Sequence, residues 1–238
     1  MRYFVKLSII VILGFGLLTP LQAQQSFEQQ LPDFEKVAVS DRIDLLLEKE
    51  DTPSAFVTYE NVSKEDIIME VKGETLRIYL QGCRRGCMDH EHQNARIKIN
   101  LSYRNLSKLV VMGSQRVEQI GALDENKFVL KAYGDSDIIM DEVRSYGFKV
   151  ALFGDGNLRV NGGSVNHLVV NSFGDQEILL GRLSSEHARL QAFGESDVDL
   201  QTHQELNISV FGESSIRYSG NPWINRKIVL GELQLQSL

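Results

Sequence analysis

The C-terminal half of the chain repeats one short pattern, and this repeat limits the fold more than any other feature of the sequence. Glycine returns at intervals of 18 to 21 residues. In the central repeats each glycine follows an apolar segment that ends in an aromatic residue and precedes an acid and a second apolar segment. The glycines are Gly113, Gly134, Gly154, Gly174, Gly194, Gly212 and Gly231. Such a period is typical of a solenoid, in which one unit buries its apolar face only by stacking on its neighbours.

Within the repeat, apolar side chains recur at fixed distances from the glycine. Four residues after it stand Val117, Ile138, Leu158, Ile178, Val198, Ile216 and Leu235, and four residues before it stand Leu130, Val150, Val170, Leu190 and Ile208. Because side chains alternate along a strand, these positions share one face. The leucine-rich repeat has a similar period, but its sequence frame is absent. We therefore predict an all-β fold, a β-helix-like solenoid over residues 108–238.

Residues 34–107 have strand patterns without the repeat. Apolar residues alternate at Val37, Val39, Ile43, Leu45 and Leu47, and no segment keeps a helical period. An uncovered first coil would offer unpaired N–H and C=O groups to other strands. We predict that these irregular strands form an N-terminal β cap. No Pro-rich or Gly/Ser-rich linker divides the chain, so residues 24–238 are predicted to form a single domain.

The first 23 residues are predicted to be a secretory signal peptide. Arg2 and Lys6 precede an apolar run from Leu7 to Leu18, and the small-residue end at Ala23 suits cleavage. No later stretch has the roughly 20 apolar residues of a membrane helix, so we expect no membrane span. The protein is expected in the periplasm, at the cell surface or outside the cell.

The charge of the chain argues against nucleic-acid and lipid partners. The formal net charge is -7 at pH 7, and loss of the two basic residues of the leader makes it more negative. Phosphate backbones and anionic membranes repel such a body. We expect no nucleic-acid partner.

Three segments carry a resemblance to a known family. They are the opening strand at 34–47, the GETLRI segment at 73–78, and the YSGNP segment at 218–222. With these segments the mature chain resembles the DUF2807 proteins, described as putative autotransporter adhesin, head GIN domain, and common among exported proteins of Bacteroidetes. The resemblance implies a β-rich fold and a role in adhesion or surface binding. The chain departs from the family where an acid follows the repeated glycine in place of serine.

The acids after the glycines form the first candidate site. They are Asp135, Asp155, Asp175, Glu195 and Glu213, with Glu232 in the last repeat. In stacked turns, neighbouring carboxylates would lie about 5 Å apart and repel by about 1 kcal/mol in water. Exposed turn chemistry is the favoured interpretation, because one carboxylate per rung seldom supplies the six or more oxygens of a calcium site. Calcium bound between rungs is the alternative.

The aromatic residues before the glycines form the second candidate. They are Tyr133, Phe153, Phe173, Phe193 and Phe211. Their parity is opposite to that of the inward positions, so either the strand bends or the rings face outward. An inward, stacked core ladder is favoured, since a contiguous exposed apolar strip is uncommon on a soluble monomer. Outward rings beside carboxylates would form a strip suited to binding sugars or a protein.

The only two cysteines, Cys83 and Cys87, form the third candidate. In an exported chain a local disulfide is the favoured interpretation. Such a bridge closes a very short loop and stabilises little. The alternative adds His90 and His92 as a zinc site with nonstandard spacing.

Catalysis has the weakest support in the sequence. Every repeat offers the same acid, whereas acid–base chemistry needs two carboxylates in different environments. The motifs of serine hydrolases, zinc proteases and phosphate-binding loops are absent, so we expect no catalytic residue and no cofactor. The predicted function is a non-catalytic binding or adhesion module whose partner is a glycan or a surface protein. A carbohydrate-active enzyme and a purely structural envelope protein remain the alternatives.

The last repeat, KIVLGELQLQSL, ends on a strand with no visible cap after it. An open strand edge invites pairing with another chain. We therefore expect the N-terminal segment or a second copy of the chain to cover this edge, the second case giving a homo-oligomer.

Overall fold

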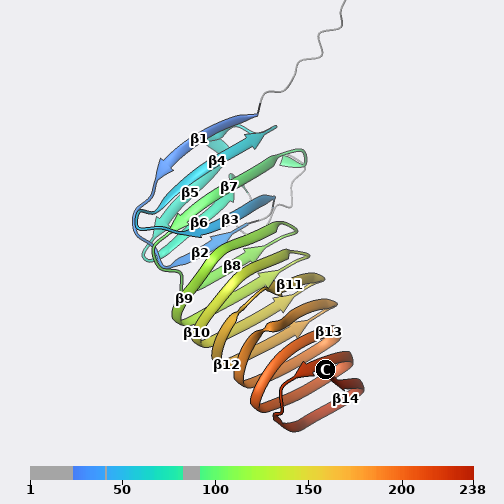
Figure 1. The fold of residues 1–238 in the computed structure, drawn as a ribbon. Coiled ribbons are helices and arrows are strands. Elements are labelled where there is room, and N and C mark those ends of the chain that lie inside the picture. The colour runs from blue at the N-terminus through green and yellow to red at the C-terminus, as the bar shows by residue number, and fades with distance from the viewer. Residues whose placement is uncertain (1–23, 41, 83–91) are drawn as a thin grey trace, which may run out of the picture.

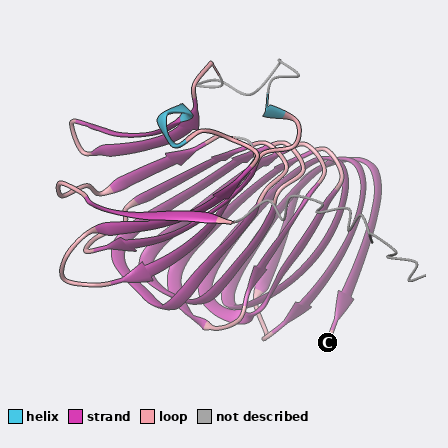
Figure 2. Ribbon diagram, turned by 90° about the horizontal axis from the view of Figure 1, so that it is seen from above, coloured by secondary structure: helices cyan, strands magenta, loops and turns pink. Residues whose placement is uncertain are grey.

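The protein is an all-β solenoid with about six turns (Figure 1). The structure is a computed structural model that describes residues 24–40, 42–82 and 92–238. Strand makes up 78% of the structure, with coil stacked on coil (Figure 2). The predicted fold class is therefore confirmed. The predicted signal peptide, Cys83, Cys87 and His90 lie outside the described residues.

The repeats are the rungs of a parallel stack. Phe148 lies opposite Phe128, and Leu168 lies opposite Phe148, so each residue meets its counterpart one repeat away. The strands of this stack are β8 (Lys108–Met112), β9 (Arg116–Tyr133), β10 (Asp137–Phe153), β11 (Gly156–Val160), β12 (Gly163–Phe173), β13 (Gln176–Ser219) and β14 (Trp223–Ser237). The 20-residue period of the sequence is thus one full turn of the chain.

Each turn has three sides, because the alternation of inward and outward side chains shifts twice per turn. In β9 the buried residues are Val117 and Gln119, then Leu123, then Phe128, Leu130 and Ala132. Residues 116–120, 122–125 and 127–133 therefore lie on three different sides. We call the side that follows each glycine the first side, the next one the second side, and the side that ends in the aromatic residue the third side.

The interior consists of aliphatic columns that run along the solenoid. The inward positions predicted from the repeat, such as Val150, Leu158 and Ile178, are fully buried. One inward column is polar: Ser136, Gln176 and Ser196 stand two residues after a repeat glycine and are buried. The hydroxyls of Ser196 and Ser172 lie 2.8 Å apart and satisfy each other inside the stack.

The N-terminal strands close one end of the stack. They are β1 (Gln25–Gln30), β2 (Lys36–Val39), β3 (Ile43–Lys49), β4 (Ser54–Glu60), β5 (Ile67–Lys72), β6 (Thr75–Leu80) and β7 (Arg96–Tyr103), with a short 3-10 turn at Lys64–Asp66. Strands β2 and β3 continue the parallel stack onto β8 and β9. Beyond them β7 pairs antiparallel with β4, β4 with β1, and β6 with β5. The predicted irregular β cap is therefore present.

The other end of the stack is open. Strand β14 pairs with β13 on one side, and none of the other described strands pairs with it. The N-terminal strand β1 lies at the opposite end of the solenoid (Figure 1). The expectation that the N-terminal segment covers the last strand is therefore wrong for the described residues, because β1 pairs with β4 instead.

Candidate binding surface

The repeat glycines form the corner between the third and first sides. Gly154 has φ +115°, a conformation that L side chains rarely adopt, and a Cβ built on it would lie 2.8 Å from the carbonyl oxygen of Gly134. The Gly154 N–H donates to the carbonyl of Phe173 at 3.0 Å. Glycine is therefore required here for both conformation and the close approach of neighbouring rungs.

The aspartates after these glycines complete the hydrogen bonding of the corner. The N–H of Asp155 donates to the carboxylate of Asp135 at 3.3 Å, and the N–H of Asp175 donates to that of Asp155 at the same distance. Each carboxylate thus replaces a backbone acceptor where the ladder bends. At the later corners the strand runs on without a break, and Glu213 pairs through its backbone with Glu232. The sequence reasoning missed this structural role of the acid.

The aromatic residues lie on the outer surface of the third side. Tyr133 is 40% exposed, and Phe153, Phe173, Phe193 and Phe211 are half-buried, whereas the residue before each ring is buried. The favoured interpretation as an inward core ladder is therefore wrong. The strand keeps its alternation up to the glycine, so the opposite parity of the rings turns them outward.

The rings nevertheless form a ladder. Neighbouring ring centroids lie 4.6–4.9 Å apart and the ring planes are within 6° of parallel. This spacing is the distance between neighbouring strands, so the rungs themselves bring ring onto ring. Each inner ring has its faces covered by its two neighbours and presents mainly an edge to solvent. The ladder therefore stabilises the outer surface and leaves few open ring faces for a ligand.

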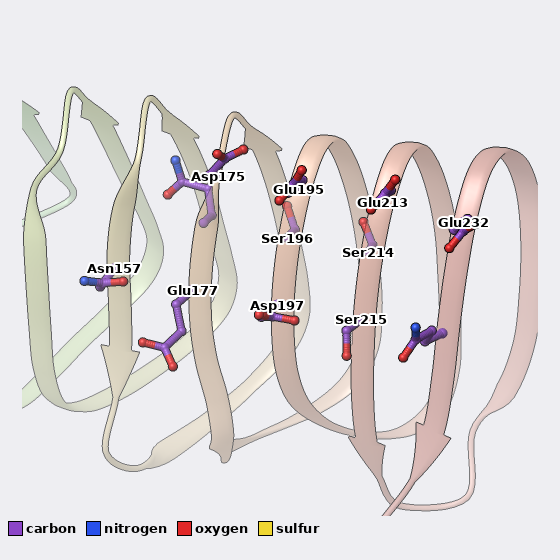
Figure 3. A pocket seen from close by; sticks show the side chains of 12 residues that line it. Asn157, Asp175, Glu177, Glu195, Ser196, Asp197, Glu213, Ser214, Ser215 and Glu232 are labelled. Atoms are coloured by element: carbon purple, nitrogen blue, oxygen red, sulfur yellow. The ribbon is translucent and has the colours of Figure 1, made fainter.

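An acidic groove of about 430 Å³ runs across the first side of the later rungs (Figure 3). Six carboxylates line it: Asp175, Glu177, Glu195, Asp197, Glu213 and Glu232. None of the six forms an ion pair with another described residue. The groove therefore carries a negative charge that the described part of the protein does not neutralise.

The groove contains only part of the predicted set. Asp175, Glu195 and Glu213 line it, whereas Asp135 and Asp155 lie on earlier rungs outside it. Sequence reasoning missed Glu177 and Asp197, which stand three residues after a glycine. Alternation along the strand was the signal that could have found them, because positions one and three after the glycine share the outer face.

No arrangement of three or more His, Cys, Asp or Glu side chains that could hold a metal ion occurs among the described residues. Along the first side each rung adds carboxylates in a row, which does not surround a cation with six or more oxygens. Of the proposed zinc ligands, only His92 is among the residues that the structure describes.

The third side has the opposite charge. Lys127, Lys149 and Arg189 are exposed there beside the half-buried Lys131, and none of them forms an ion pair within the described chain. Near the start of the same side, the rings of His167 and His187 stack at 5.1 Å, with Tyr146 edge-on to His167. The net negative charge of the chain thus conceals a side with unpaired cations.

The family model described as "Putative auto-transporter adhesin, head GIN domain", DUF2807, matches residues 33–222. The chain belongs to the DUF2807 family. The match covers the capping strands other than β1 and most of the solenoid of this DUF2807 protein. A search of curated proteins found no match.

Solved structures share the fold. A putative adhesin from Bacteroides fragilis is 15% identical, with a TM-score of 0.79 over 92% of this chain and 99% of that chain. A putative adhesin from Parabacteroides distasonis is 16% identical, with a TM-score of 0.68 over 91% and 97%. A putative lipid binding protein from the same organism is 18% identical, with a TM-score of 0.64 over 90% and 96%. At these identities the likeness concerns the fold.

The described residues include no helix long and apolar enough to cross a membrane.

Proposed function

We propose that this DUF2807 protein is an exported, non-catalytic adhesion module that binds a surface protein through its acidic groove. The observation that carries the proposal is the set of six unpaired carboxylates along one open groove. The description of the family as adhesins supports an exported binding role. Carboxylates repeated from rung to rung suit an extended partner better than a small molecule, because the groove runs along the solenoid (Figure 3).

The geometry favours a basic protein segment over a neutral glycan. Sugars bind to open aromatic faces, and the stacked rings from Tyr133 to Phe211 cover most of theirs. Carboxylates without a cation partner attract Lys and Arg side chains, and Arg can bind a carboxylate with two hydrogen bonds. Repeated cations along the partner would meet repeated carboxylates along the groove.

The test uses the mature chain, residues 24–238, immobilised against a Lys/Arg-rich peptide and a neutral polysaccharide. The variant Asp175→Asn, Glu195→Gln, Glu213→Gln should weaken peptide binding about tenfold, since each exposed pair contributes up to about 1 kcal/mol. Wild-type binding should weaken with salt. The control variant Asp124→Asn, Glu142→Gln, Glu186→Gln removes equal charge outside the groove and should bind as wild type.

If both variants lost peptide affinity equally, the loss would be due to net charge alone, and the groove would be ruled out as the binding site. Binding of the polysaccharide with no binding of the peptide would replace the protein partner by a glycan.

A further inference from the structure

Apolar side chains that face solvent concentrate at the open end of the solenoid. Nine large hydrophobic side chains are exposed among the described residues, and five of them belong to the last coil and the chain end. These are Trp223 at 65%, Ile228 at 47%, Val229 at 38%, Leu230 at 63% and Leu238 at 67% exposure. The last coil is therefore more apolar than the outer face of a terminal repeat usually is.

The last strand also has an unpaired edge. The N–H of Leu238 donates to the carbonyl of Tyr218 in β13 at 2.8 Å. Because backbone groups alternate along a strand, those of Leu233, Leu235 and Ser237 point away from β13. These three residues offer N–H and C=O groups to a further strand, and none of the described strands takes them.

Only one part of β14 is protected against pairing. Between Trp223 and Leu230 the register with β13 shifts, and Arg226 and Lys227 add charge. A bulge and charged side chains are common ways to block an edge strand. The segment Gly231–Ser237 has no proline and Glu232 as its one charged residue, so it is the part of the edge that can pair.

Other described segments of the chain do not reach this edge. Strand β1 is paired with β4 at the capped end. Strands β6 and β7 pair with β2 and β3, so they too lie at the capped end.

We propose that a second copy of the chain covers this edge, with Gly231–Ser237 paired antiparallel to the same segment of the second copy. The corner at Gly231 and the strand end at Ser237 place the two-fold axis at Gln234. Leu233 then lies opposite Leu235 of the second copy and exchanges hydrogen bonds with it, because both have outward backbone groups. Leucine meets leucine on the inner face, and Gln234 meets its own copy on the outer face.

The charges on this segment agree with the pairing. Glu232 lies opposite Gln236 of the second copy, so the two Glu232 carboxylates stay apart. Glu232 and Gln234 both line the acidic groove, and the grooves of the two copies would therefore meet end to end at the axis. This consequence for ligand binding rests on the proposed function, whereas the pairing itself is tested without any ligand.

The first test compares one substitution at two outward positions of the same strand by sedimentation over a concentration series. Gln234→Lys places two lysines opposite each other on the axis and should weaken association about fivefold. Gln236→Lys places each lysine opposite Glu232 of the other copy and should tighten association by a similar factor. Wild type should reach twice the mass of one chain. A single-chain mass throughout the series would overturn the proposal.

The second test maps the register by oxidation in a background in which Cys83 and Cys87 are serine. Gln234→Cys should form a disulfide between copies, since residues opposite each other in a non-hydrogen-bonded pair have Cα atoms about 4.5 Å apart. Gln236→Cys should stay reduced, because its copy lies about 13 Å away. Equal cross-linking at both positions, or none at Gln234→Cys, would refute this pairing.

Discussion

The two ends of the solenoid differ in how they treat the strand edge at the end of the stack. At the N-terminal end, β7 pairs in parallel with β3. Strands β4 and β1 then add to the sheet in antiparallel pairs. At the C-terminal end, β14 stays parallel to β13 up to Ser237, with one shift of register on the way, and then the strand ends. The irregular sequence of residues 34–107 can turn back on itself, whereas a regular repeat presents the same open edge after any number of coils.

Substitution of interior leucines should give the largest difference in stability between the two ends. Leu101 in β7 is fully buried at the capped end, and Leu235 in β14 is partly exposed at the open end. Leu101→Ala should lower the free energy of unfolding by about 3–4 kcal/mol, and Leu235→Ala by about 1 kcal/mol. Chemical denaturation at low protein concentration measures both. Costs of equal size would show that the last coil is packed as tightly as the cap.

The corner glycines extend the comparison along the stack. Gly154→Ala should cost about 3 kcal/mol, because alanine is strained at φ +115° and its Cβ meets Gly134 of a rung that is fixed from both sides. A Cβ at Gly231 would come even closer to the carbonyl of Gly212, but the last coil can shift outward, so Gly231→Ala should cost less. Thermal unfolding of the two variants checks the order, which a larger loss at Gly231 would contradict.

A tyrosine at the capped end should make stability sensitive to high pH. Burial raises the pKa of the Tyr103 hydroxyl to about 12. The unfolded chain releases this proton near pH 10, so the stabilising effect is complete below pH 10 and is lost as pH rises toward 12. The loss should be about 1.4 kcal/mol per pH unit in that window. Denaturation of Tyr103→Phe should show a shallower slope, and parallel slopes would refute the assignment.

The smallest expected effect is the difference in stability between substitutions at the aspartate corners and at the glutamate corners. Asp155→Ala removes the acceptor for the N–H of Asp175 and should cost about 1 kcal/mol. Asp155→Asn keeps an acceptor oxygen and should cost less. Glu213→Ala, in a corner where the strand is continuous, should leave the free energy of unfolding nearly unchanged. A loss at Glu213→Ala as large as that at Asp155→Ala would show that the side chains have the same role.

Part of the binding surface could be predicted and part could not. The acids after the glycines were found because they recur at one position, and the structure places four of the six in the groove. The orientation of the rings could not be decided from the repeat, because their parity permitted either a bend in the strand or an outward ladder. The cations of the third side do not form a repeated column. Lys149 and Arg189 both stand five residues before a glycine, but valine occupies this position in the repeats next to Lys149.

The sequence by itself determined the rungs, the inward aliphatic columns and the place of the glycine corner in each turn, because these follow from side-chain alternation and from a glycine that returns once per turn. Only the tertiary structure decided what the repeated residues do. Stacking at the strand spacing covers ring with ring, brings each corner carboxylate to the N–H of the next rung, and gathers six acids into one groove. These contacts join residues about one turn apart, so no local pattern contains them.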